Sequence, residues 1–194
     1  ADPTKIFTLD ELNSYALGRP ANFAPGTRRV YTNANTNLLG AVVEKVTGKP
    51  FKDVLNERIL EPLGLKNTHY LRDAAQWPEP HAVGYEPVDG VLTPEPANLS
   101  IYGPAGAMVS NLDDMRVWAE TLASGRLLKP ATQSARLEGA PLEEGPPYDL
   151  YALGIGETGG WWGHNGEGFG FTAPVFHDQR TGAPVAGFQD GSQA

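Results

Sequence analysis

The chain has 194 residues, and its 23 acidic side chains outnumber 15 basic ones, so its formal net charge is −8 and its pI is about 4.9. This balance excludes a protein that binds nucleic acid or an anionic membrane through a basic surface, because phosphate recognition needs Lys and Arg on one face. Hydrophobic residues make up 40% of the chain, enough for a core, and the lack of cysteine excludes disulfides, thiol nucleophiles and thiolate metal sites.

The first 140 residues carry the periodicity of short helices. Thr8 followed by Glu11 is a capping-box pattern, and Gly18 and Gly48 each end a run of apolar residues at helical spacing. Ser110 with Asp113 predicts a further N-cap. The predicted helices span residues 8–18, 35–48, 50–61, 110–125 and 130–137, with the third broken by the Pro-Leu-Gly-Leu run at 62–65.

Two regions depart from the helical pattern. Residues 73–98 are dense in proline, acidic and aromatic residues without a sustained period, which predicts a long irregular excursion beside a binding cleft. After Pro147 the pattern becomes that of short strands, at residues 148–154 and 161–163. A further strand at 171–176 is expected to pair with 184–188 across the turn at 178–182.

Several chemical patterns are weak. The glycines of residues 154–159 fit a dinucleotide loop, but Trp161-Trp162-Gly163-His164 follows instead of a helix, so a tight turn is the better interpretation. The four histidines show no metal-ligand spacing, and we expect no metal or other cofactor. Acidic doublets at 113–114 and 143–144 are typical of solvated faces, with paired-carboxylate catalysis as a minor alternative.

Two short segments are better candidates. Tyr31-Thr32-Asn33 ends an extended stretch just before a helix, where side chains can project into a cleft. His164-Asn165-Gly166 lies among glycines that would let a substrate approach the backbone. On local grounds alone, a structural interpretation is favoured: Tyr31 as a core aromatic, Asn33 as a helix N-cap and His164 as a strand residue.

An ordered set of motifs changes that balance. The first half of the chain contains Phe-Ala-Pro-Gly-Thr at 23–27, Tyr-Thr-Asn-Ala-Asn at 31–35, Leu-Leu-Gly at 38–40, Glu-Lys-Val-Thr-Gly at 44–48 and Ile-Leu-Glu-Pro-Leu-Gly-Leu at 59–65. The second half contains Gly-Pro-Ala-Gly-Ala-Met-Val-Ser at 103–110 and Gly-His-Asn-Gly at 163–166. Together they resemble the penicillin-recognising superfamily of serine β-lactamases, D-alanyl-D-alanine carboxypeptidases and class C-like esterases. The resemblance spans most of the chain in the correct order.

The resemblance implies an α/β (α+β) fold of the β-lactamase/transpeptidase type. Residues 1–140 would form a mostly helical lobe that carries Tyr-x-Asn. Residues 141–194 would supply antiparallel strands that carry His-x-Gly and form only part of a sheet, so the fold would be incomplete in this chain.

The resemblance also implies roles for the candidate residues. Tyr31 would exchange the proton of a serine nucleophile, Asn33 would bind the acyl-side amide of the substrate, and His164 would complete the polar network. Asn165, Gly166 and Glu167 would bind substrate, with the Glu167 backbone N–H as half of the oxyanion hole.

The third element of such enzymes, Ser-x-x-Lys, is absent from the sequence. The residues three positions before the six lysines are, in order, Asp, Val, Val, Lys, Leu and Arg, so none of these positions holds Ser or Thr. We therefore expect the chain to be a fragment or one chain of a split enzyme, inactive alone. A companion chain or a second copy would complete the fold.

The resulting hypothesis is a serine hydrolase that forms an acyl-enzyme and acts on a D-alanyl peptide, a β-lactam or a small ester or amide. A carboxylate at Glu167 disfavours substrates with a terminal carboxylate, unless that side chain points away. The alternative is a non-catalytic relative that binds a peptide or a partner. The resemblance implies a secreted, periplasmic or cell-envelope location, with the cytoplasm as the alternative, and the sequence predicts no transmembrane segment.

Overall fold

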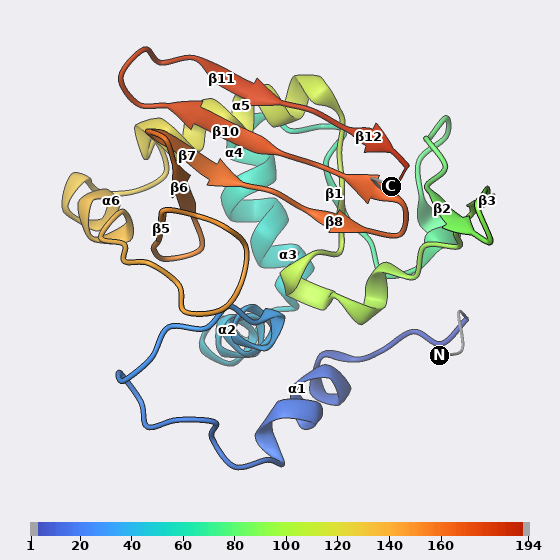
Figure 1. The fold of residues 1–194 in the computed structure, drawn as a ribbon, viewed down its shortest axis with the longest axis horizontal. Coiled ribbons are helices and arrows are strands. Elements are labelled where there is room, and N and C mark those ends of the chain that lie inside the picture. The colour runs from blue at the N-terminus through green and yellow to red at the C-terminus, as the bar shows by residue number, and fades with distance from the viewer. Residues whose placement is uncertain (1–3, 192–194) are drawn as a thin grey trace.

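A computed structural model describes residues 4–191 (Figure 1). Its largest sheet has five antiparallel strands in the order β11-β10-β7-β6-β5. These strands are β5 (Leu150–Tyr151), β6 (Gly156–Thr158), β7 (Trp161–His164), β10 (Val175–Asp178) and β11 (Pro184–Ala186). The sequence predicted β7 and the pairing of β10 with β11, but it placed no strand at β6.

A second sheet has three strands in the order β12-β9-β8. Its strands are β8 (Glu167–Gly168), β9 (Phe171–Thr172) and β12 (Gln189–Asp190). Each of its strands is next in the chain to a strand of the first sheet: β8 follows β7, β9 precedes β10 and β12 follows β11. The single strand predicted at 171–176 is therefore wrong, because β9 pairs with β8 and β12 while β10 pairs with β7 and β11. Pro174 stands at the break, where it has no N–H to donate to a ladder.

Four predicted helices are present: α1 (Leu9–Leu17), α2 (Asn33–Thr47), α5 (Leu112–Ser124) and α6 (Pro130–Arg136). Helix α1 begins with the predicted capping box. The suggested caps of the other two long helices are wrong. Thr32, not Asn33, caps α2, and Asn111, not Ser110, accepts the Asp114 N–H at the start of α5.

The third predicted helix consists of three consecutive pieces. It comprises α3 (Phe51–Leu55), a π-helical turn η1 (Asn56–Leu60) and α4 (Glu61–Leu63), and it ends at Gly64 with φ 69°. The predicted end within residues 62–65 is confirmed, and the helix passes through Pro62 because the turn before it is wide: the Glu61 N–H donates to the Asn56 carbonyl. The wider turn relieves the clash that a proline makes with a carbonyl one turn earlier.

The excursion predicted at 73–98 contains regular structure. A 3-10 turn, η2 (Ala74–Gln76), precedes a hairpin of β2 (Tyr85–Val88) and β3 (Val91–Pro94). Asp89 and Gly90, the two residues between the strands, have φ of 51° and 78°, as a type I′ hairpin turn requires. The prediction of an irregular excursion is wrong for residues 85–94, because it did not consider Asp-Gly as a hairpin turn signal.

Short elements connect the helices to the sheets. Strand β1 (His69–Tyr70) pairs with β4 (Met108–Val109), and the 3-10 turns η3 (Leu99–Ile101) and η4 (Gly103–Ala105) precede β4 in the chain. Helix α5 packs across β7, β10 and β11 (Figure 1). The two buried apolar clusters are centred on Leu60, Leu63 and Leu65, and on Tyr70, Leu99 and Ala107.

One helix face is left without cover. On α2, Leu38, Leu39, Val42 and Val46 are between 42% and 74% exposed although they recur at helical spacing. Between residues 4 and 191, none of the helices has the length and apolar character needed to cross a membrane.

Close backbone contact at β7 generates a stability prediction. A Cβ on Gly163 would lie 2.0 Å from the Val175 carbonyl oxygen and 2.6 Å from the Phe176 Cα, so β7 and β10 would have to separate. We expect Gly163→Ala to lower the free energy of unfolding by roughly 2–3 kcal/mol, measured by urea denaturation. Gly166→Ala is the matched control, since its Cβ meets nothing closer than 3.7 Å. Equal stability of the two variants would contradict the packing described.

Candidate active site

Tyr31 is held by a short parallel bridge to a distant segment. The Tyr31 N–H donates to the Glu144 carbonyl at 2.9 Å, and the Glu143 N–H donates to the Arg29 carbonyl at 2.8 Å. Gly145 lies directly against the Tyr31 side chain: its φ is 140°, and an added Cβ would be 2.5 Å from the Tyr31 Cβ. Residues 143–145 therefore fix the start of α2 beside the sheet.

This placement brings the Tyr31 ring to β5 and β7. Its centroid lies 5.6 Å from that of Tyr151 and 5.8 Å from that of the His164 imidazole. Tyr148 completes the group, at 5.5 Å from His164 and 5.7 Å from Tyr151. We call Tyr31, Tyr148, Tyr151 and His164 the aromatic cluster. It unites Tyr31 and His164, which are 133 positions apart, so the predicted proximity of these two residues is confirmed.

Hydrogen bonds orient the imidazole. The Nδ1 of His164 faces the Asn165 carbonyl oxygen, which can only accept, so Nδ1 carries the proton of the neutral ring. The Nε2 of His164 then accepts from the Tyr151 hydroxyl at 3.1 Å. These two contacts select one tautomer of His164.

The phenols of the cluster are held in their neutral form. Burial raises the pKa of Tyr31. Burial raises the pKa of Tyr151 more strongly, and the neighbouring Tyr31 and Tyr148 raise it further. The pKa of Tyr148 also rises through burial, although the Asn165 N–H partly offsets the rise. Among the described residues, no positive charge lowers the pKa of Tyr31, so a phenolate there needs a cation from elsewhere.

Asn33 and Asn165 have different surroundings. Asn33 is the first residue of α2, and its exposed side chain has no hydrogen-bond partner within residues 4–191. It lies two residues after Tyr31 and is available to a ligand. The Asn165 side chain instead accepts from the Tyr148 hydroxyl, which in turn accepts the Asn165 N–H at 2.8 Å. Asn165 is therefore tied to the aromatic cluster.

The backbone N–H of Glu167 points to a free edge. Gly166 and Ala173 exchange two hydrogen bonds, at 3.0 and 2.8 Å, so the next pair, Glu167 and Thr172, is of the non-hydrogen-bonded kind. Its N–H groups point away from the partner strand, and β8 is the outer strand of its sheet. The Glu167 N–H consequently meets no acceptor in the part of the chain that the structure describes. It can donate to a developing oxyanion.

The two serines closest to family motifs serve structural roles. Ser100 is fully buried; it donates to Asn98 Oδ1 at 2.6 Å and accepts the Phe7 N–H at 3.0 Å. The Ser110 hydroxyl contacts Thr68 Oγ1 at 2.8 Å. Ser100 therefore cannot reach a substrate, and Ser110 is held within the region that joins β4 to α5.

Sequence reasoning did not single out Tyr148 and Tyr151. Both lie in the segment predicted as an aromatic strand, but a strand pattern does not tell which aromatic side chain will meet a histidine 13 or 16 residues later. The six predicted site residues also line neither of two cavities, of about 210 and 170 Å³, among the described residues. All six are partly or fully exposed.

Comparisons with known proteins agree with the fold and with the motifs. The family model described as Beta-lactamase matches residues 1–186. A D-aminopeptidase of Brucella anthropi is 32% identical over 184 residues, which cover 91% of this chain and 34% of that protein. The chain thus spans about a third of the length of this curated relative.

Solved structures give the same result. A D-stereospecific amidohydrolase from Streptomyces sp. superimposes with a TM-score of 0.86 at 28% identity, covering 97% of this chain and 58% of the other. The D-amino acid amidase from Ochrobactrum anthropi SV3, complexed with L-phenylalanine amide, gives 0.83 at 28% identity, over 96% and 57%. The predicted β-lactamase/transpeptidase-like fold is confirmed.

The hydrogen bonds of His164 generate a spectroscopic prediction. We expect the neutral ring to carry its proton on Nδ1, so that ¹⁵N NMR of the chain shows a protonated Nδ1 and an unprotonated Nε2. Tyr151→Phe removes the donor to Nε2 and should reduce this preference. Tyr148→Phe is the control, because its hydroxyl contacts Asn165 and not a nitrogen of His164. A ring protonated mainly on Nε2 would show that the network is wrong.

Proposed function

Because this chain belongs to the beta-lactamase family, we propose that it forms part of the active site of a serine hydrolase that cleaves an amide of a D-amino acid. The observation that supports this most directly is the convergence of the Tyr31 ring, the His164 imidazole and the region of β8 that carries a free backbone N–H. A hydroxyl that moves a proton and a donor for an oxyanion are two requirements of acyl transfer.

The proposed reaction passes through an acyl-enzyme. A serine oxygen attacks the amide carbon, and its proton passes to the Tyr31 oxygen, which a cation from the missing segment holds as a phenolate; the phenol so formed then donates a proton to the leaving nitrogen. The Glu167 N–H stabilises the negative carbonyl oxygen, an interaction worth roughly 3 kcal/mol. The Asn33 amide holds the acyl side of the substrate. Water then hydrolyses the ester, which releases the acid and restores the serine hydroxyl.

The attacking serine is proposed to come from a polypeptide segment outside this chain. None of the six lysines has Ser or Thr three residues before it, and Ser100 is buried. The same segment would supply the lysine cation that Tyr31 needs, since burial alone raises the pKa of the phenol. The segment therefore accounts for two missing features of the site.

The uncovered face of α2 is consistent with such a companion segment or a second copy. Its four exposed apolar residues, Leu38, Leu39, Val42 and Val46, lie on the helix that begins with Asn33. Covering such a face stabilises a complex by roughly 25 cal/mol for each Å² of apolar surface removed from water. We propose that the functional unit contains this additional polypeptide.

The proposed substrate class follows from the relatives and from one charge. The relatives are described as a D-aminopeptidase, a D-amino acid amidase and a D-stereospecific amidohydrolase. The exposed Glu167 carboxylate belongs to the residue whose N–H would face the reacting carbonyl. A negative charge there disfavours a substrate carboxylate nearby and tolerates a neutral amide or a free ammonium group.

The role of Tyr31 can be tested in the complex or longer polypeptide that carries Ser-x-x-Lys. Tyr31→Phe removes the hydroxyl that transfers the proton, so acylation by a D-amino acid amide should fall by at least about 10²-fold with folding preserved. Stopped-flow or rapid-quench kinetics would measure the acylation step. Tyr15→Phe, at a tyrosine that is 60% exposed on α1, should leave the rate unchanged.

Near-normal acylation by the Tyr31→Phe variant would remove Tyr31 from the mechanism. Absence of any covalent label from a fluorophosphonate probe on the complete assembly would favour a non-catalytic binding protein of this family.

A second prediction concerns selectivity in the same assembly. Glu167→Gln removes the negative charge and should raise kcat/KM for a substrate with a free terminal carboxylate, relative to its amide, by about fivefold. Glu61→Gln, at an exposed residue of α4, is the matched control. An unchanged ratio would show that the Glu167 side chain points away from the substrate.

A further inference from the structure

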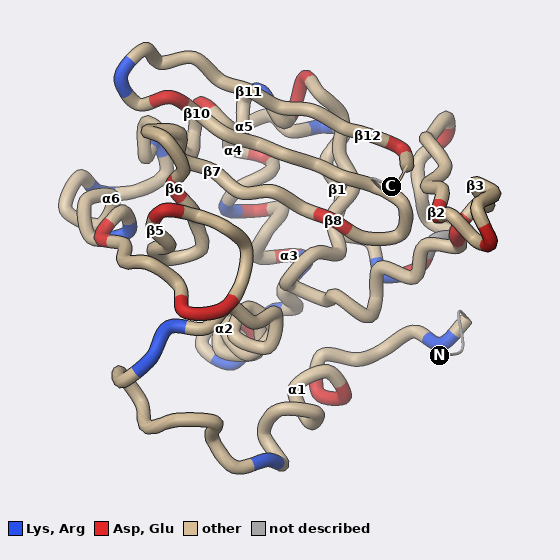
Figure 2. The backbone as a smooth tube through the Cα atoms, viewed as in Figure 1, with Lys and Arg blue, Asp and Glu red and all other residues tan. Residues whose placement is uncertain are grey.

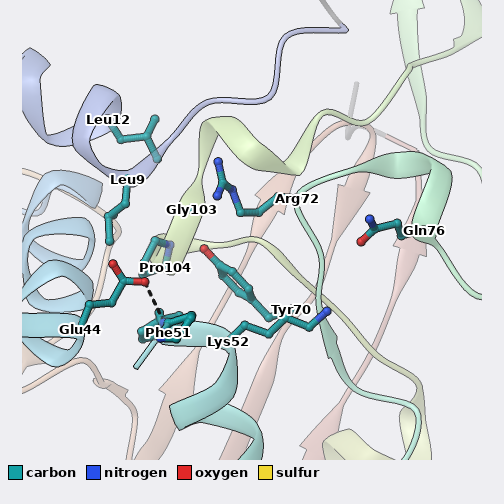
Figure 3. A pocket seen from close by; sticks show the side chains of 11 residues that line it. Leu9, Leu12, Glu44, Phe51, Lys52, Tyr70, Arg72, Gln76, Gly103 and Pro104 are labelled. Atoms are coloured by element: carbon teal, nitrogen blue, oxygen red, sulfur yellow. Dashed lines mark hydrogen bonds between the residues drawn. The ribbon is translucent and has the colours of Figure 1, made fainter. Parts of the chain in front are cut away.

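A cavity of about 210 Å³ lies beside α2, and no residue of the aromatic cluster lines it (Figure 3). Residues from α1, α2, α3, β1 and η4 surround it. Glu44, which lines it, lies 11 residues along α2 from Asn33, or about 16 Å at 1.5 Å per residue. The cavity is thus separate from the proposed reaction site.

The cavity contains more positive than negative charge. The Arg72 guanidinium and the Lys52 ammonium line it, and neither forms an ion pair with any of residues 4–191. Arg72 is partly buried, where an unpaired charge carries a desolvation cost. The arrangement favours an anionic ligand, because such a ligand would offset that cost.

One negative group faces the same space. One oxygen of Glu44, a residue that lines the cavity, accepts the Phe51 N–H at 2.8 Å, and its other oxygen is open, without a hydrogen-bond partner within residues 4–191 (Figure 3). The buried Tyr70 directs its hydroxyl between Glu44 and Arg72. Both charges act on that hydroxyl: burial raises the pKa of Tyr70, Arg72 lowers it and Glu44 raises it. The polar groups therefore converge.

The remaining wall is apolar. Leu9 and Leu12 of α1 face Phe51 and Pro104 across the opening (Figure 3). The volume is below the range of ~300–1,000 Å³ typical of pockets for drug-sized ligands, so it suits a ligand no larger than one amino acid. Two cationic residues, a carboxylate oxygen and an aliphatic wall match the three parts of a free amino acid.

We propose that this cavity is a binding site for a free amino acid with an apolar side chain. The Arg72 guanidinium holds the ligand carboxylate, with the Tyr70 hydroxyl donating to it and Lys52 adding positive charge. The open oxygen of Glu44 accepts from the ligand ammonium group. The ligand side chain packs against Leu9 and Leu12. This inference does not depend on the proposed function, since the binding requires no turnover.

The test uses the 194-residue chain and three matched probes: leucine, as both enantiomers, leucinamide, and 4-methylpentanoate. Calorimetry gives the affinity, and ¹H–¹⁵N spectra locate the site. We expect saturable binding of leucine, weaker binding of 4-methylpentanoate, which lacks the ammonium group, and the weakest binding of leucinamide, which lacks the carboxylate. The shifted signals should belong to residues around Tyr70 and Arg72.

Variants separate this site from other causes of binding. Arg72→Gln should weaken leucine binding at least tenfold, and Lys52→Gln, at an exposed position that leaves the fold unchanged, should weaken it several-fold. Arg116→Gln, on the exposed face of α5, should leave the affinity unchanged. No saturable binding of leucine, equal affinity for leucinamide, or shifts centred on Tyr31 and His164 would each overturn the proposal.

Discussion

Burial of the Tyr31 ring between the start of α2 and strands β5 and β7 is the contact on which the candidate site depends. The parallel bridge to residues 143–145 sets the backbone, and the Tyr151 and His164 rings set the side chain. Without this contact, the helical region and the strand that continues into β8 would lack a common reactive surface. The same burial has a chemical cost, because it raises the pKa of the phenol that the proposed mechanism needs as a base.

The order of motifs along the chain was enough to predict the fold and the meeting of Tyr31 with His164, and local signals predicted α1, α2, α5 and α6. The errors have physical causes. Asp89-Gly90 forms a hairpin turn within a segment without periodicity, and Pro174 divides one expected strand into two. Tyr148 and Tyr151 could not be assigned because their contacts with His164 and Asn165 are tertiary.

Helix α2 connects the two proposed sites. Its first residue, Asn33, lies beside the aromatic cluster, and Glu44 near its other end lines the amino-acid cavity. The two sites have opposite electrostatic character. Figure 2 shows an acidic residue at β8, whereas the cavity contains two cationic residues, Arg72 and Lys52, beside Glu44. The first suits a substrate without a nearby carboxylate, and the second suits a ligand that has one.

The most direct test of the central claim is a nuclear Overhauser measurement between the ring protons of Tyr31 and those of His164 in the folded chain. With ring centroids 5.8 Å apart, cross-peaks between the two rings should appear, together with cross-peaks from Tyr151 to each of them. If both rings are assigned and no cross-peak joins Tyr31 to His164, these residues do not share a site, and the account of a divided hydrolase active site is wrong.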